Sequence, residues 1–333
     1  MLIILIAIIY LTLRSIYSKT SFEAVMQVIY NIKPYYLFMG LSIITLYFVF
    51  QGIYMKMALK IFDVNIPLRK GVFYSLVEFY FSGITPSSTG GQPVQLYYMT
   101  KDKIPMKNSY IVLLINTIFF KIILLTLGIF ALIFRPEFIF NNEFVYIFFF
   151  VFGFVSDLII ILMCSLFLFN RKVIKNILTK IFALGKHFKK FREFSEKKDI
   201  DKFISEYSTQ LKTVKQNKKA IIKSFIITFI QRLTMFSIAY LVYRALGFNS
   251  YNYLDLLCVQ VTVQLAVEML PIPGGSLLSE MMFYNMFTLI FLSKNADTGM
   301  LLTRTFSFYI PILVSGLIIL SYSVYDRVFR KKK

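Results

Sequence analysis

Long runs of apolar residues recur along nearly the whole chain and limit what it can fold into. The stretch YIFFFVFGFVSDLIIILMCSLFLF is apolar on every face of a helix. It is long enough to cross a hydrocarbon layer of about 30 Å at about 1.5 Å per residue. A spanning β-barrel would need alternating apolar and polar residues, which these runs lack. Since 57% of the 333 residues are hydrophobic, we expect an all-α integral membrane protein with one transmembrane domain, residues 1–333.

Hydrophobic runs bounded by charges predict about six spanning helices, near residues 1–16, 35–58, 108–134, 142–169, 220–245 and 298–323. The first run, MLIILIAIIYLTL, has no basic region before it and no small-residue cleavage site after it. We interpret it as a short or incomplete span rather than a signal peptide. Two further hydrophobic regions, 71–100 and 252–292, are interrupted by Pro and Gly clusters.

Basic residues predict how the chain is oriented. Residues 171–219 carry 15 Lys or Arg against 5 Asp or Glu, and the tail DRVFRKKK is also basic. The positive-inside rule puts both in the cytoplasm, which predicts a multi-pass protein of the bacterial plasma membrane with a cytoplasmic C-terminus. Region 71–100 then begins and ends inside, whereas region 252–292 begins and ends outside.

These directions predict an inverted repeat, with residues 35–134 as the first unit and 220–323 as the second. Each unit contains a broken or re-entrant helical hairpin. The arm 71–84 has 14 residues and reaches only about 21 Å as a helix, which is too short to span. Region 252–292 is either re-entrant or two full spans around a broken centre. Mirrored broken helices are typical of transporters with a site near the bilayer midplane.

Glycine pairs follow prolines in both interrupted regions, as ITPSSTGGQPVQLYYM and EMLPIPGGSLLSEMMF. Gly90, Gly91, Gly274 and Gly275 permit positive φ angles and close approach of backbone amides to a ligand. Helices that start beyond them would direct N–H groups at an anion such as a lipid phosphate. The alternative is that these residues only make tight turns.

Ionisable residues inside spans are candidates for function because they are costly to bury in a membrane. Lys121 and Asp157 lie at nearly equal depth in consecutive spans, which predicts an ion pair that is either functional or purely structural. Arg232 and Arg304 have no acidic neighbour at helical spacing, which favours an external anion. Two glutamates precede the breaks, and they would hold an arginine, a substrate ammonium or an internal salt bridge. These are Glu78 and Glu268.

The segment 171–219 has an apolar stripe flanked by lysines, which predicts adsorption to anionic lipids of the inner leaflet. His187 lies within it and is interpreted as a surface residue. The isolated Cys164 and Cys258 predict neither a disulfide nor a metal site, and no motif indicates a cofactor or a catalytic centre. The net charge of +20 is explained by orientation, so no nucleic-acid partner is expected. A homo-oligomer is left open.

The segments TPSSTGGQPVQLYYMTKDKIP, EMLPIPGGSLLSE and TRTFSFYIPILVSGL resemble the lysylphosphatidylglycerol synthase transmembrane family, the flippase-like module of multiple peptide resistance factors. The resemblance covers residues from about 35 to 325. It implies a membrane domain that moves aminoacylated or otherwise modified phospholipids between leaflets. It also implies that the translocation region is lined by Thr85, Pro86, Gly90, Gly91, Gln92, Pro93, Glu268, Pro273, Gly274, Gly275 and Arg304.

The leading hypothesis is therefore a bacterial flippase or transporter for an anionic or aminoacylated phospholipid such as phosphatidylglycerol. An alternative is a phosphatidylglycerol lysyltransferase, or its membrane subunit, linked to resistance against cationic antimicrobial peptides. Family members that make the lysyl lipid carry a cytoplasmic transferase domain, which the 333 residues do not include, so we do not expect transfer from this chain. A third hypothesis is a membrane scaffold that recruits partners through 171–219.

Overall fold

A computed structural model of the chain describes residue 30 and residues 32–140, 144–169, 209–268, 278–291 and 296–329. Within these ranges the protein is helical and contains no strand. The elements are α3 (Pro34–Lys60), α4 (Leu68–Gly83), the 3-10 turn η1 (Pro86–Ser88), α5 (Gly91–Lys101), α6 (Met106–Phe134), α7 (Glu137–Phe140), α8 (Phe144–Phe169), α12 (Lys218–Ala245), α13 (Tyr253–Glu268), α14 (Leu278–Thr288), α15 (Ala296–Arg304), the π-helical turn η4 (Thr305–Tyr309) and α16 (Ile310–Phe329).

Five helical segments of the described ranges are long and apolar enough to span a membrane. They are Pro34–Lys60, Met106–Phe134, Phe144–Leu168, Lys218–Ala245 and Thr298–Val324. They coincide with five of the six predicted spans, and their boundaries differ from the predictions by one or two residues at most. The predicted span 1–16 lies outside the described residues, as does most of the basic segment 171–219.

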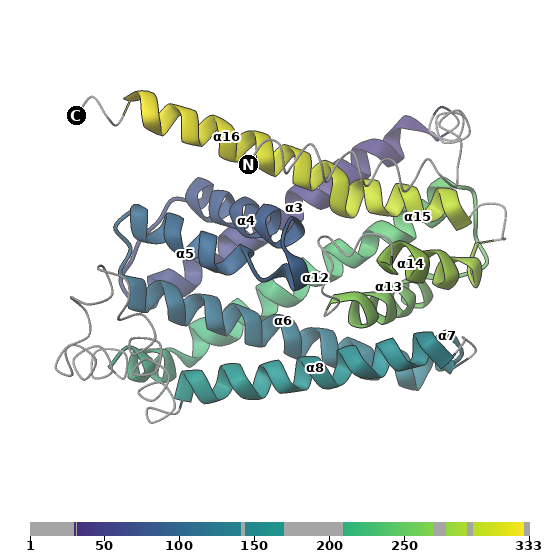
Figure 1. Ribbon diagram of the computed structural model, residues 1–333, viewed down its shortest axis with the longest axis horizontal. Coiled ribbons are helices and arrows are strands. Elements are labelled where there is room, and N and C mark those ends of the chain that lie inside the picture. Colours follow the sequence, from purple (N-terminus) through teal and green to yellow (C-terminus); the bar gives the residue numbers. More distant parts are fainter. Residues whose placement is uncertain are drawn as a thin grey trace, which may run out of the picture.

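Both interrupted regions contain a pair of short helices. α4 has 16 residues and α5 has 11, and the described helices α13 and α14 also have 16 and 11. A helix of 16 residues reaches about 24 Å, less than the hydrocarbon thickness of about 30 Å, which favours a re-entrant second region. The two pairs enter the bundle from opposite ends, and the C-terminal ends of α4 and α13 lie toward its middle (Figure 1).

The elements that follow each short pair pack on the other pair. α6 packs against α13, and α16 packs against α4. Near the centre, α3 and α12 pack along each other (Figure 1). The helix order, the helix lengths and this exchange of contacts correspond between the two units. The inverted repeat itself stays a prediction.

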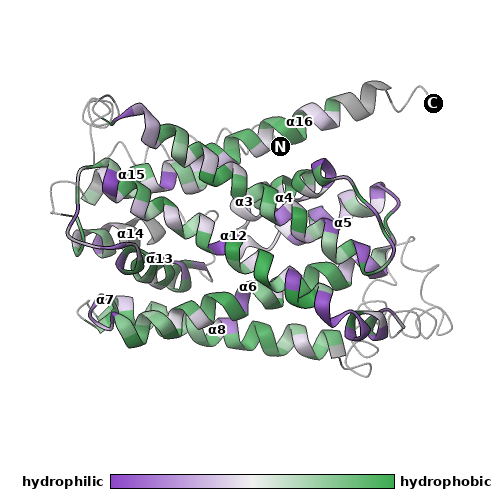
Figure 2. Ribbon diagram, turned by 180° about the vertical axis from the view of Figure 1, so that it is seen from behind, coloured by the Kyte–Doolittle hydropathy of each residue, from purple (hydrophilic) through white to green (hydrophobic). Residues whose placement is uncertain are grey.

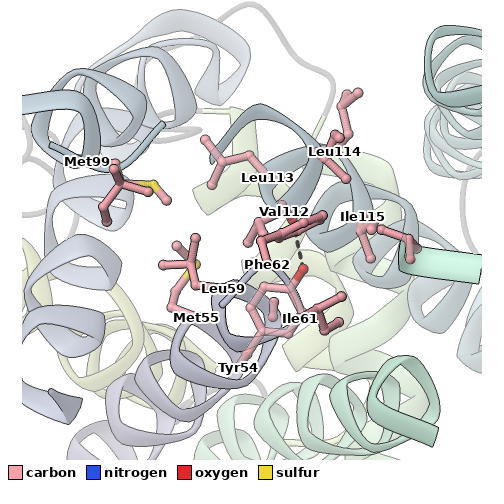
Figure 3. Close-up of a cluster of buried hydrophobic side chains, with 14 of the residues drawn as sticks. Tyr54, Met55, Leu59, Ile61, Phe62, Met99, Val112, Leu113, Leu114 and Ile115 are labelled. Carbon is pink, nitrogen blue, oxygen red and sulfur yellow. Dashed lines mark hydrogen bonds between the residues drawn. The ribbon is translucent and has the colours of Figure 1, made fainter. Parts of the chain in front are cut away.

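A buried apolar cluster holds the base of the α4–α5 pair against α3 and α6. It contains Met55 and Leu59 of α3, Met99 of α5 and the start of α6 (Figure 3). The hydroxyl of Tyr54, which is fully buried, donates a hydrogen bond of 2.8 Å to the main-chain oxygen of Val112. This bond ties α3 to α6 close to the cluster.

The long helices carry mainly apolar residues along their length, while hydrophilic residues gather at their ends and in the connections (Figure 2). α8 is the most peripheral of the candidate spans, since only 17% of its most apolar window is buried against 44% for α6. Its exposed residues are large and apolar, such as Phe148, Phe152 and Leu162. Asp157 is the exception, because it points inward and is 1% exposed.

Candidate functional site

The break between α4 and α5 is a compact turn held by Thr85. The Thr85 hydroxyl donates a hydrogen bond to the main-chain oxygen of Phe81 at 2.6 Å and accepts one from the amide of Gly90 at 2.9 Å. Ser87 and Ser88 have φ angles of 48° and 55°. Non-glycine residues rarely adopt this left-handed region, so the turn is locally strained.

The role expected for the glycines of this turn is partly wrong. Gly90 has a φ of −83°, and Gly91 is not among the residues with positive φ. The positive angles fall on the two serines instead. Gly91 is needed for space, because a Cβ atom there would overlap the Ser82 hydroxyl and lie 2.6 Å from the main-chain oxygen of Glu78. The start of α5 therefore packs directly on the last turns of α4.

A cavity of about 520 Å³ lies where the two short helical pairs meet. Its lining comes from both pairs and from α3, α6, α8, α12, the end of α15 and the π-helical turn. The lining includes many charged and polar side chains for a site among apolar helices. The charged groups are Glu78, Lys121, Arg232, Glu268 and Arg304, and the uncharged polar groups include Gln92, Asn116, Thr117, Gln260, Gln264 and Ser307.

One wall of the cavity contains a three-residue ion cluster. The ammonium of Lys121 on α6 lies 2.6 Å from Asp157 Oδ1 on α8 and 2.6 Å from Glu268 Oε1 at the end of α13. The ion pair expected from the depths of Lys121 and Asp157 is thus present, with Glu268 as a second carboxylate. Removing Lys121 from this cluster would leave two buried carboxylates without a cation, at a cost of about 3–5 kcal/mol.

The two arginines lie against aromatic rings. The guanidinium carbon of Arg232 is 3.6 Å from the ring centroid of Phe120 and 5.8 Å from that of Tyr47. The guanidinium carbon of Arg304 is 4.4 Å from the ring centroid of Phe308. Each such cation–π contact contributes about 0.5–2 kcal/mol when partly desolvated. The N–H donors of a guanidinium point outward along the edge of its plane, where a carboxylate or phosphate can bind bidentately.

Arg304 is placed by an irregular stretch of helix. It is the last residue of α15, and the π-helical turn η4 follows it directly. Such turns occur often at functional sites because they reorient the side chains beside them. Here Ser307 and Phe308 of the turn line the cavity together with Arg304.

The structure brings together some of the sequence-predicted site residues. Glu78, Gln92, Pro93, Lys121, Arg232, Glu268 and Arg304 line the cavity. Asp157 is buried behind Lys121. Thr85, Pro86, Gly90 and Gly91 form the turn and do not line the cavity. Pro273, Gly274 and Gly275 lie outside the described residues.

Sequence reasoning missed the aromatic partners and several amides. Phe120 and Phe308 were indistinguishable from other apolar residues, because phenylalanine is abundant throughout the chain. Asn116, Gln260 and Gln264 carried a usable signal, since amides are uncommon within apolar spans. Gln92 was predicted, and its side-chain nitrogen donates a hydrogen bond to the Thr117 hydroxyl, which connects the start of α5 to α6.

These features define a multi-pass helical membrane protein with a charged cavity between two broken helical pairs. The family model for the lysylphosphatidylglycerol synthase TM region matches residues 1–315, and the chain belongs to this family. This confirms the resemblance carried by the TPSSTGGQP and PIPGG segments. A function related to membrane lipids is consistent with that membership. No curated protein and no solved structure matches the chain significantly.

Proposed function

We propose that the protein moves an anionic or aminoacylated phospholipid between the leaflets of a bacterial plasma membrane. The observation that carries the proposal is the cavity of about 520 Å³, which has arginines in its lining and lies between helical pairs that enter from opposite ends. Irregular backbone among membrane helices is tolerated only where it is buried in protein or lines a wet cavity. Arranged about such a cavity, mirrored broken helices support alternating access.

The cavity size supports a headgroup as the ligand. Sites for small ligands measure about 300–1,000 Å³, so this one suits a phosphoglycerol headgroup while the acyl chains stay in lipid. Arg232 and Arg304 would bind the phosphate, because guanidinium groups hold phosphate bidentately. An aminoacyl ammonium would lie near Glu78, whose carboxylate accepts a hydrogen bond of 3.2 Å from the Ser82 hydroxyl.

Reconstitution tests the proposal directly. The purified protein is inserted into liposomes with a labelled phosphatidylglycerol in one leaflet, and label that reaches the other leaflet is followed by chemical quenching. We expect faster transfer than in protein-free liposomes. Equal rates in the two preparations would contradict the proposal.

A matched pair of variants tests whether the cavity is the route. Ser307 lines the cavity, and Ser307→Trp would fill part of it. Ser42 of α3 is exposed and does not line the cavity, so Ser42→Trp adds the same side chain elsewhere. We expect only Ser307→Trp to slow transfer, in preparations whose thermal unfolding shows intact folding.

A further inference from the structure

The ion cluster of Lys121, Asp157 and Glu268 is charge-imbalanced. One ammonium faces two carboxylates at 2.6 Å each. Lys121 and Asp157 are 3% and 1% exposed, and the Glu268 side chain is 13% exposed. With every group ionised, the cluster carries one uncompensated negative charge on largely buried side chains.

Two oxygen atoms of the cluster lack hydrogen-bond partners within the described part of the chain. They are Asp157 Oδ2 and Glu268 Oε2, and both are buried. A buried carboxylate oxygen without a donor is costly, and such a group usually binds a proton instead of remaining charged. Two carboxylates that share one site hold a proton for the same reason, since both cannot ionise close together without a penalty.

The surrounding helices do not supply a second cation to the cluster. α12 contributes Arg232, whose guanidinium stacks on the ring of Phe120. The Lys121 ammonium also contacts this ring, at 5.3 Å from its centroid. α4 contributes Glu78 and α3 contributes Tyr47, which both interact electrostatically with Glu268. α8 contributes Cys164, which interacts with Lys121. Within the described ranges, Lys121 is the only cation paired with either carboxylate.

We propose that this cluster is a proton-binding site and that its proton is exchanged through the cavity. Glu268 lines the cavity and Asp157 does not, so a proton enters from cavity water at Glu268 and is shared with Asp157. A metal ion is a poor alternative, because the Lys121 ammonium already occupies the position between the two carboxylates. A proton neutralises the remaining negative charge without displacing the Lys121 ammonium.

The position of Glu268 gives proton binding a mechanical consequence. Glu268 is the last residue of α13, directly before the break of the second helical pair. When its carboxylate is ionised it is held by Lys121 of α6, and when it takes up a proton that attraction weakens. Proton uptake thereby releases the C-terminal end of α13 from α6. Loss of the proton to the opposite side of the membrane restores the contact between Glu268 and Lys121. This coupling rests on the proposed transport function, whereas the proton site does not.

Infrared titration of the purified protein tests the proton site without any transport assay. We expect a protonated-carboxyl band that disappears as the pH is raised. Asp157→Asn and Glu268→Gln should each remove it. Asp255→Asn is the matched control, because Asp255 is 3% exposed and paired with a single cation, Arg135. A band that survives both cluster variants, or is absent from the wild-type protein, overturns the proposal.

Folding of the variants is checked by thermal unfolding, and the more exposed Glu268→Gln serves if Asp157→Asn does not fold.

The coupling is tested in proteoliposomes with an imposed pH gradient. One coupled proton should change the lipid distribution by up to about tenfold per pH unit. Lipid transfer that does not depend on the pH gradient, or that depends on a sodium gradient instead, overturns the coupling but not the proposed transport function. A titrating band in a protein that moves no lipid supports the proton site and contradicts the proposed function.

Discussion

A Cβ atom at Gly153 would overlap the main-chain carbonyl oxygen of Leu265. α8 and α13 therefore approach each other here more closely than any residue with a side chain would allow. Asp157 follows Gly153 by one helical turn, and Glu268 follows Leu265 by about one turn. Small residues at helix crossings are the usual way in which membrane helices reach such proximity. This crossing brings both carboxylates within reach of Lys121.

Gly153→Ala should destabilise the protein by about 1–3 kcal/mol, the usual cost of overpacking a close contact. The methyl group would meet main-chain atoms, which cannot move away without separating the helices. Gly128→Ala is the matched control on α6, because the nearest atom to its Cβ would be the end of the flexible Leu265 side chain, at 2.6 Å. Thermal unfolding in detergent measures both losses. Equal losses would show that the crossing does not control the packing.

Arg304→Ala and Arg232→Ala should each reduce lipid transfer by about tenfold or more. Hydrogen bonds to a charged group contribute about 1.5–3 kcal/mol, and about 1.4 kcal/mol corresponds to a factor of ten. Arg244→Ala serves as the control, since Arg244 is exposed in the last turn of the same helix as Arg232. The measurement is the transfer rate of labelled phosphatidylglycerol. Unchanged rates in folded variants would remove the arginines from the proposed headgroup site.

Tyr54→Phe should lower the free energy of unfolding by about 0.5–1.5 kcal/mol, the net contribution of one hydrogen bond. The variant keeps the buried ring and deletes only the hydroxyl that bonds to Val112. Tyr97→Phe provides the comparison, because Tyr97 is 59% exposed on α5. Denaturation midpoints of the two variants measure the difference. A midpoint for Tyr54→Phe that matches the wild type would mean that the bond adds nothing to stability.

Asp102 closes the base of the first helical pair. Its Oδ2 accepts a hydrogen bond of 2.7 Å from the Tyr74 hydroxyl, and its Oδ1 lies 2.9 Å from the Lys70 ammonium. Asp102→Ala should cost about 1–3 kcal/mol, because the Tyr74 hydroxyl, on a buried side chain, loses its acceptor. Lys70→Ala should cost less than about 1 kcal/mol, since the Lys70 side chain is 36% exposed and screened by solvent. Thermal unfolding of both variants tests this order.

The spans were predictable because membrane crossing depends on local hydrophobicity, which a single window of sequence contains. The first hairpin was predictable for a related reason, since its prolines and glycines interrupt an otherwise apolar region. The backbone conformation of the turn between α4 and α5 was not predictable. Gly90 and Gly91 were singled out because glycine permits positive φ angles, but such angles occur at Ser87 and Ser88. Glycine permits a left-handed conformation without requiring it, and here Gly91 is required by its contact with α4.

The sequence by itself determined that this chain is a helical membrane protein, where its long helices lie and that its buried charges call for an explanation. Only the tertiary structure decided which charges meet. Lys121 contacts Asp157 and Glu268, which are 36 and 147 positions away along the chain. The depth of a charge within a span follows from its position in the sequence. Its partners depend on which helix faces pack together, and that packing is set by side-chain contacts between helices far apart along the chain.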